Sequence, residues 1–209
     1  MYRPPHFDET RIDVLHSAIK DHPLGLLIRN GPEGLTADNI PFQIKPHGEF
    51  GLLRAHVARA NPLWHELANN DEVLVVFQGP QHYVTPGWYQ TKQETGKVVP
   101  TWNYVMVQAH GRITIHDNTT FLADQTRALT DEHEAGRKNA WSVDDAPEAF
   151  IAAQMRAIVG IEVEITRLIG KWKVSQNRAV TDRQGVVTGL ASETDQNAAA
   201  MADLVKGTL

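Results

Sequence analysis

The chain has 209 residues, 42% of them hydrophobic, and its 20 Lys and Arg against 25 Asp and Glu give a net charge of -5. This is the composition of a folded globular protein, and it excludes a fibrous or intrinsically disordered chain. The sequence has no cysteine, which excludes disulfide bonds and any metal or catalytic site built on a thiolate.

The sequence shows no membrane or secretion signal. Its opening residues lack the apolar core of a signal peptide, and no apolar run approaches the about 18 residues that cross a bilayer. We therefore expect a cytoplasmic protein with no membrane partner. The acidic balance argues against a broad nucleic-acid interface, because such interfaces need clustered Lys and Arg.

The first 80 residues are predicted to alternate short helices and strands. Ile12, Leu15 and Ile19 share one helical face, which predicts an amphipathic opening helix. The apolar run at 73–77 is typical of a fully buried strand, and the Gly-Pro pair that follows is expected to close it. Helices are expected over residues 8–20, 52–60 and 63–67, and strands over residues 24–29, 35–44 and 73–77.

The remaining residues predict fewer but longer elements. Residues 98–116 are expected to form a long bent strand or a hairpin, with the bend at Gly111. A helix is expected over 121–133, and another from Asp144 to a stop at Gly160. Residues 161–165 alternate between apolar and charged types, which predicts a strand with one buried face.

The fold class follows from the order of these elements. Short strands with interspersed helices, in no regular βαβ alternation, favour a mainly antiparallel α+β barrel over a doubly wound sheet. We expect one domain over residues 1–190. Residues 191–209 are expected to be a peripheral C-terminal tail with a loose helix.

The first candidate site is the segment from Gly51 to His56. A glycine after a strand, followed by a helix start that carries Arg54 and His56, would direct free backbone N–H groups at a phosphate. An exposed arginine and a packed histidine fit the same local pattern, because isolated glycine motifs are common.

The second candidate site combines two aromatic-rich segments. Its candidate residues are Tyr83, Thr85, Thr101, Trp102, Asn103 and Tyr104. Aromatic faces with nearby amide and hydroxyl groups suit a planar heterocycle. Ordinary core packing explains the aromatic residues equally well, although a buried asparagine must find hydrogen-bond partners.

The third candidate site follows the alternating strand. Its candidate residues are Lys171, Lys173, Ser175, Gln176 and Asn177. This density of donors could close over a phosphate or the edge of a flavin ring. The alternative is a solvated loop, the usual location of a charge run.

Several chemistries are excluded by absent motifs. The sequence has no His-Glu-x-x-His, no Gly-x-Ser-x-Gly, no Walker loop and no dinucleotide fingerprint. A zinc site without cysteine would need His and carboxylates from scattered parts of the chain, so no metal site is predicted. No residue stands out as a catalytic acid or base.

Six ordered motifs together resemble one family. They are His-Val-Ala-Arg-Ala-Asn-Pro-x-Trp (56–64), Val-Phe-Gln-Gly-Pro (76–80), Tyr-Val-Thr-Pro-Gly-Trp-Tyr (83–89), Val-Pro-Thr-Trp-Asn-Tyr (99–104), Ile-Val-Gly-Ile-Glu-Val-Glu-Ile (158–165) and Gly-Lys-Trp-Lys-Val-Ser-Gln-Asn-Arg (170–178). The opening residues 2–7 fit as well. The chain resembles the PaiB-type proteins, called FMN-binding negative transcriptional regulators, over residues 1–190.

The resemblance implies a split β-barrel with peripheral helices, akin to the pyridoxamine-phosphate oxidases, and a homodimer with FMN between its subunits. By analogy, Arg54 and His56 would meet the phosphate, and the candidate residues of the second and third sites would complete the flavin pocket. Two departures are small. Thr85 stands where serine is frequent, and Asp38-Asn39 replaces the more usual Thr-His.

Two functions stay open from the sequence. The resemblance implies a regulator whose state is read out through FMN, although no helix-turn-helix or basic arm for DNA is visible. The alternative is an FMN-dependent oxidoreductase that passes electrons between NADH or NADPH and a small acceptor, with a cation such as Lys173 near the ring.

Overall fold

The structure is a computed structural model that describes all 209 residues. Spatial contacts between residues divide the chain into two compact units. Unit 1 comprises Met1–Asp21, Gln78–Val107 and Ile169–Leu209, and unit 2 comprises His22–Phe77 and Gln108–Leu168. The assignment of residues 1–190 to a single domain stays a prediction.

The strands form one sheet in the order β3-β2-β6-β7-β8-β5-β4, and β1 pairs with β8. Every register assigned between neighbouring strands is antiparallel. The strands are β1 (Asp8–Glu9), β2 (Leu24–Gly31), β3 (Gly34–Pro41), β4 (Gln43–Lys45), β5 (Leu52–Ala58), β6 (Glu72–Val84), β7 (Thr101–His116) and β8 (Ile158–Lys173). The predicted α+β class with a mainly antiparallel sheet is confirmed.

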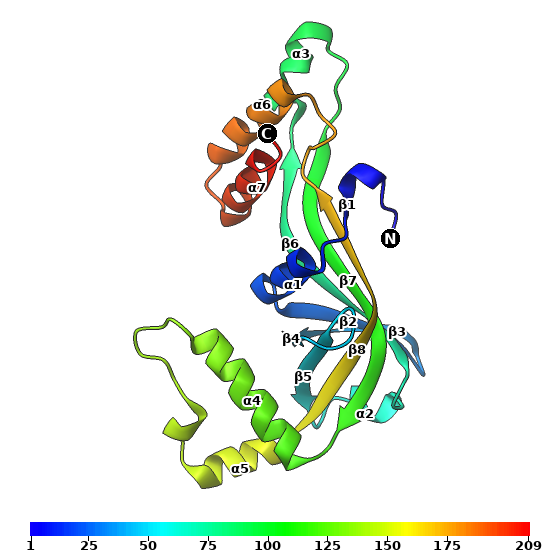
Figure 1. Cartoon of the computed structure of the whole chain (residues 1–209), viewed down its shortest axis with the longest axis vertical. Helices are drawn as coiled ribbons and strands as arrows, with labels where there is room; N and C mark the ends of the chain where they lie inside the picture. Colours follow the sequence, from blue (N-terminus) through cyan, green and yellow to red (C-terminus); the bar gives the residue numbers. More distant parts are fainter. The chain divides into compact units, whose positions relative to one another are not determined.

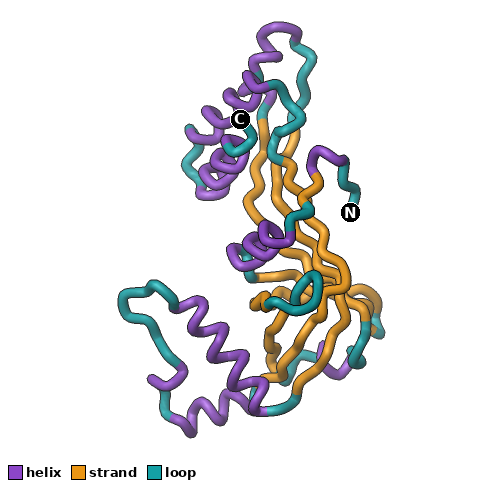
Figure 2. The backbone as a smooth tube through the Cα atoms, in the orientation of Figure 1, coloured by secondary structure: helices purple, strands orange, loops and turns teal.

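Helices lie in both units. Unit 1 contains η1 (Pro5–Phe7), α1 (Ile12–Asp21), η2 (Pro86–Trp88), α3 (Gln90–Thr95), α6 (Val180–Ala191) and α7 (Gln196–Lys206). Unit 2 contains α2 (Leu63–Glu66), α4 (Thr119–Glu134), η3 (Val143–Asp145) and α5 (Glu148–Arg156). Helix and loop alternate in the long segment between β7 and β8 (Figure 2). The helices are too short or too polar to span a lipid bilayer.

The helix predicted over 52–60 is wrong, because these residues form strand β5. Leu53, Ala55 and Val57 are buried, whereas the residues between them are only partly covered. That alternation has the period of a strand. The strand pairs on both sides, with β4 and with β8, and this pairing outweighs a local pattern that fits a helix equally well.

Two predicted stops are also wrong, because the strands run through them. Strand β6 continues past Gly79 and Pro80 to Val84, and Gly160 lies inside β8 rather than at a helix end. A Cβ atom at Gly160 would lie 2.3 Å from the ring of Phe121. This glycine therefore allows the first turn of α4 to approach β8 closely.

The core of unit 1 depends on the C-terminal helices, which lie side by side (Figure 1). Its buried side chains are Val84, Tyr89, Val105, Val174, Val186, Leu190, Ala198, Met201, Ala202 and Val205. Trp88 packs against this cluster from outside. The C-terminal helix was expected to be loose or peripheral, yet Met201 and Val205 of α7 are fully buried.

Substitution of a glycine in α6 tests this packing. Gly185→Ala should lower the free energy of unfolding, because the new methyl group would lie 1.9 Å from the carbonyl oxygen of Trp88. Overpacking costs about 1–3 kcal/mol, against a gain in helix propensity of about 1 kcal/mol. Urea unfolding measures the difference. Gly207→Ala is the control, since its nearest neighbouring atom is 3.5 Å away, and equal stability of the two variants would contradict the packing.

Candidate functional site

The structure places the predicted site residues in both units. Arg54 and His56 belong to unit 2, and all the others belong to unit 1. Within unit 1 they come from the end of β6, the start of β7, the end of β8 and the turn that follows β8. The second and third candidate sites therefore occupy one compact unit.

Lys173 joins the end of β8 to the start of β7. Its Nζ donates a hydrogen bond of 2.5 Å to Thr101 Oγ1 and another to the carbonyl oxygen of Trp102. Both acceptors are uncharged. The ammonium group is therefore held in place without a carboxylate to balance its charge.

Lys171 is also charged and almost completely covered, with 7% of its surface exposed. Its Nζ donates to the carbonyl oxygen of Tyr2 at 3.0 Å. The same atom lies 5.7 Å from the ring centre of Tyr2 and 5.2 Å from that of Tyr104. Aromatic faces attract a cation, but they leave its full charge uncompensated.

We call Lys171, Lys173 and Arg178 the cation cluster. Arg178 places its guanidinium over the ring of Tyr89, 4.9 Å from the centre, and none of the three forms an ion pair with a carboxylate. Burial, followed by the positive charges of Lys171 and Arg178, holds the pKa of Lys173 below its usual value. Burial and neighbouring positive charge both disfavour the protonated form of Lys173, and no carboxylate pairs with it to oppose them.

Asn103 and Ser175 form a buried polar pair within unit 1. Asn103 is 1% exposed, and its Nδ2 donates to Ser175 Oγ at 2.9 Å. Ser175 has a φ of 65°, a left-handed conformation that is uncommon outside glycine. The pair fixes the turn after β8 against β7, and it meets the expectation that a buried amide finds a partner.

The other predicted residues of unit 1 make local contacts or are exposed. Gln176 braces the turn, since its side chain accepts from the N–H of Val174 at 2.8 Å and donates to the carbonyl oxygen of Trp172 at 2.5 Å. Thr85 caps η2 by accepting from the N–H of Gly87. The exposed rings of Tyr83 and Trp102 meet edge to face, with 6.0 Å between centres. Asn177 is exposed.

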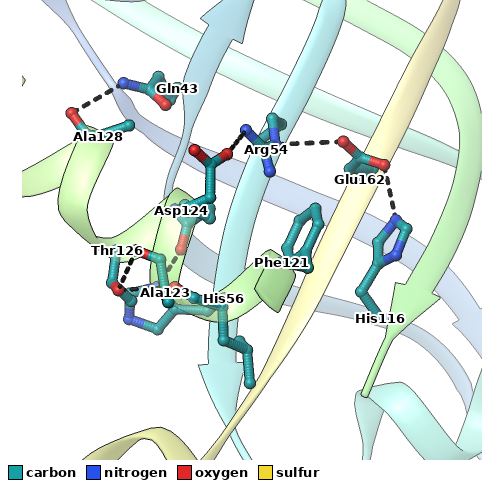
Figure 3. A network of polar contacts seen from close by, with 12 residues as sticks. Gln43, Arg54, His56, His116, Phe121, Ala123, Asp124, Thr126, Ala128 and Glu162 are labelled. Atoms are coloured by element: carbon teal, nitrogen blue, oxygen red, sulfur yellow. Dashed lines mark hydrogen bonds and ion pairs between the residues drawn. The ribbon is translucent and has the colours of Figure 1, made fainter. Parts of the chain in front are cut away.

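Arg54 occupies a different setting, on strand β5 of unit 2. Its Nη1 lies 2.7 Å from Asp124 Oδ2 and its Nε lies 3.2 Å from Glu162 Oε1 (Figure 3). The guanidinium also covers the ring of Phe121, 4.5 Å from its centre. Two carboxylates therefore compensate its charge. The idea that a helix start presents Arg54 to a phosphate is wrong, because no helix begins there.

His56 follows Arg54 on the same face of β5. Its Nδ1 lies 2.7 Å from Gln125 Oε1 of α4, and Gln125 is completely buried. Both side chains therefore connect β5 to α4. Contact of Arg54 and His56 with a phosphate stays a prediction.

Sequence reasoning missed two residues of the unit 1 site. Tyr2 contacts Lys171 through both its carbonyl oxygen and its ring, and Arg178 completes the cation cluster. Both lie in segments that carry the family resemblance, the opening residues and the last residue of the motif at 170–178. Their place in those motifs was the available signal.

Comparison with known proteins identifies the family. Residues 1–167 match the family model described as "Putative FMN-binding domain". The chain is 38% identical to an uncharacterized protein of Aspergillus fumigatus, across 90% of each chain. It is 27% identical to the Bacillus subtilis "Protease synthase and sporulation protein PAI 2", across 100% of this chain and 98% of that protein.

The fold matches a solved flavoprotein. The flavocytochrome Anf3 of Azotobacter vinelandii superposes with a TM-score of 0.56 over 82% of this chain and 72% of that one, at 14% identity. Such a likeness shows the fold alone and confirms the predicted flavin-binding split-barrel type. The family match assigns FMN as the cofactor. The chain belongs to the PaiB-type family of FMN-binding proteins.

Proposed function

We propose that this protein is a PaiB-like negative regulator of transcription that acts as a homodimer and holds FMN through the cation cluster of unit 1. Lys171, Lys173 and Arg178 would hold the anionic parts of the cofactor. The Asn103–Ser175 pair and the turn with Gln176 and Asn177 would hold its polar ring edge. The observation that carries the proposal is the absence of any carboxylate paired with the cluster.

The charge balance supports this assignment of FMN. A buried or half-buried cation without an anion is unfavourable, because it has lost water and gained no partner. Lys171 and Lys173 are in that condition, because their contacts are neutral oxygens and, for Lys171, aromatic rings. A phosphorylated, planar cofactor brings negative charge together with a flat aromatic surface. The donor set of unit 1 therefore fits FMN.

Exposed aromatic surface supports the homodimer. Trp102 is 54% exposed and Tyr83 is 42% exposed, and Val99 and Tyr2 are exposed as well. Large apolar side chains that gather on an exposed surface mark interaction sites. Two of these four, Tyr2 and Trp102, contact the cation cluster through their carbonyl oxygens, as expected for a cofactor site that a second copy completes.

The regulatory role rests on the family and on the printed name of the Bacillus relative, which concerns protease synthesis and sporulation. The net charge of -5 disfavours direct binding to DNA, because a DNA-binding surface must neutralise phosphates. The regulation that we propose is therefore indirect and depends on the state of the bound cofactor.

A second candidate function is an FMN-dependent oxidoreductase. FMN supplies hydride and electron transfer when it is bound. The cation cluster favours this candidate, since fixed positive charge stabilises negative charge that develops during a reaction. Lys173 would stabilise the negative charge that develops on the reduced flavin. The exposed ring of Trp102 would offer a surface for a small acceptor or NADH.

The assignment of FMN predicts a loss of affinity in Lys173→Gln. FMN binding should weaken by about 1.5–3 kcal/mol, the net worth of a charged hydrogen bond, as measured by quenching of flavin fluorescence. Lys97→Gln, an exposed lysine of the same unit, should bind FMN like the wild type. Equal affinities of both variants would remove Lys173 from the site.

Arg54→Ala tests the phosphate prediction in the same assay. Thermal stability is measured alongside, because Arg54 also balances the charges of Asp124 and Glu162.

The charge balance predicts an unusual titration of Lys173. In the ligand-free protein its pKa lies below the ordinary 10.5, and Lys171→Gln should raise it by removing a neighbouring positive charge. In the wild-type protein, Lys173 has its ordinary pKa of 10.5 in the unfolded chain and a lower pKa in the folded one, so the unfolded chain binds the proton more tightly. The free energy of unfolding therefore rises with pH between the lowered pKa and 10.5. Carbon-13 NMR of labelled lysines measures the titration, and a pKa unaffected by Lys171→Gln would contradict the coupling.

The homodimer and the choice between functions are tested together. Sedimentation of the FMN-loaded protein should report a dimer, and a strict monomer would refute the interface.

Anaerobic mixing with NADH or NADPH distinguishes the two functions. No bleaching of the flavin absorbance is expected for the regulator, whereas rapid bleaching would establish the oxidoreductase instead.

A further inference from the structure

Unit 2 contains an open cavity of about 500 Å³ that uses none of the predicted flavin residues. Strands β2, β3, β6, β7 and β8 supply its wall. Arg29, His110 and Arg167 contribute polar groups to the lining, and Ile28, Leu35 and Leu74 contribute apolar ones. Cavities that bind small molecules have this size and this mixture of apolar surface with a few polar groups.

Arg29 is the most deeply buried polar residue of the cavity, at 4% exposure. Its Nη1 lies 2.6 Å from Glu66 Oε2, which balances the charge. Its Nε, however, is buried and has no hydrogen-bond partner. Successive side chains of a strand point to opposite faces, so Arg29 points with Glu66 to the face of β2 opposite to Ile28. Its side chain therefore borders the cavity from the core and is not offered to a ligand beside Ile28.

His110 has an unsatisfied ring nitrogen at the same cavity. Its Nε2 is buried and has no partner. Burial, followed by the positive charge of Arg167, lowers the pKa of His110. The imidazole is therefore neutral at neutral pH and can present an N–H donor to a ligand.

Arg167 adds an unpaired charge beside His110. It is exposed, and no carboxylate lies within ion-pair distance. The one carboxylate of the lining, Glu72, faces Arg112 at 3.9 Å. Since Glu66 balances Arg29 and Arg112 faces Glu72, Arg167 gives the cavity a net positive charge.

We propose that this cavity binds a small organic anion, with its carboxylate on Arg167 and His110 Nε2 and its apolar body on Ile28, Leu35 and Leu74. Leu35 is 80% exposed, which is unfavourable in water and is relieved when an apolar group covers it. The guanidinium geometry suits a carboxylate, because it offers two parallel N–H groups. This site is separate from the cation cluster and does not rest on the binding of FMN.

The test uses benzoate as a probe and the FMN-loaded protein as the receptor. Isothermal titration calorimetry should give saturable binding of benzoate with one site per chain. Arg167→Gln should weaken it at least about tenfold, the effect of losing one charged hydrogen bond. Arg156→Gln is the matched control, since Arg156 is exposed and unpaired in the same unit, and it should bind benzoate like the wild type.

The apolar half of the site has its own test. Leu35→Ser should weaken benzoate several-fold, and inorganic phosphate should bind at least about tenfold more weakly than benzoate because it lacks an apolar body. Flavin absorbance is followed throughout, so that displacement of FMN is distinguished from binding at the cavity. The proposal is overturned if benzoate does not saturate, if it displaces FMN, or if Arg167→Gln and Arg156→Gln bind it equally.

Discussion

Uncompensated positive charge is the constraint on which the rest of unit 1 depends. Lys171 and Lys173 are withdrawn from water at the end of β8, and carbonyl oxygens, one hydroxyl and aromatic faces are their contacts. Such contacts orient an ammonium group without neutralising it. The polypeptide therefore holds three cations near one another at the expense of stability, which is reasonable where an anionic cofactor belongs to the function.

The charges around Arg54 in unit 2 are instead paired. Arg54 lies between Asp124 and Glu162, and Glu162 also accepts from His116 at 2.6 Å (Figure 3). The rings of His116 and Phe121 stack at 4.1 Å. Each charge of this network has a partner of opposite sign or a hydrogen bond, so the network fastens α4 to the strands. The contrast shows why a basic residue next to a glycine does not by itself mark a ligand site.

The sequence predicted the fold class and several elements, because strong periodic signals agree with the tertiary structure in those places. Leu122 of the predicted helix at 121–133 is buried in α4, and the alternation at 161–165 lies in β8. The helix predicted over residues 52–60 was wrong, because their pattern of apolar residues fits both a helix and a strand. Pairing with β4 and β8 makes them a strand. Gly79, Pro80 and Gly160 were wrongly predicted to end elements. For Gly160 the structural reason for a glycine is the ring of Phe121, which is far away in sequence. The candidate residues of unit 1 were found through motifs, whereas the cation cluster itself required three dimensions.

Neither unit is continuous along the chain, and this has a consequence for how the protein forms. Unit 1 is assembled from three separate stretches and unit 2 from two. The pairing of β5 with β8 joins residues about a hundred positions apart. A chain of high contact order loses loop-closure entropy before its native strand pairs form and stabilise it. Folding is therefore slow relative to a helical bundle of equal size. For the same reason a genetic cut cannot separate the two units, since any fragment that contains one of them whole also carries part of the other.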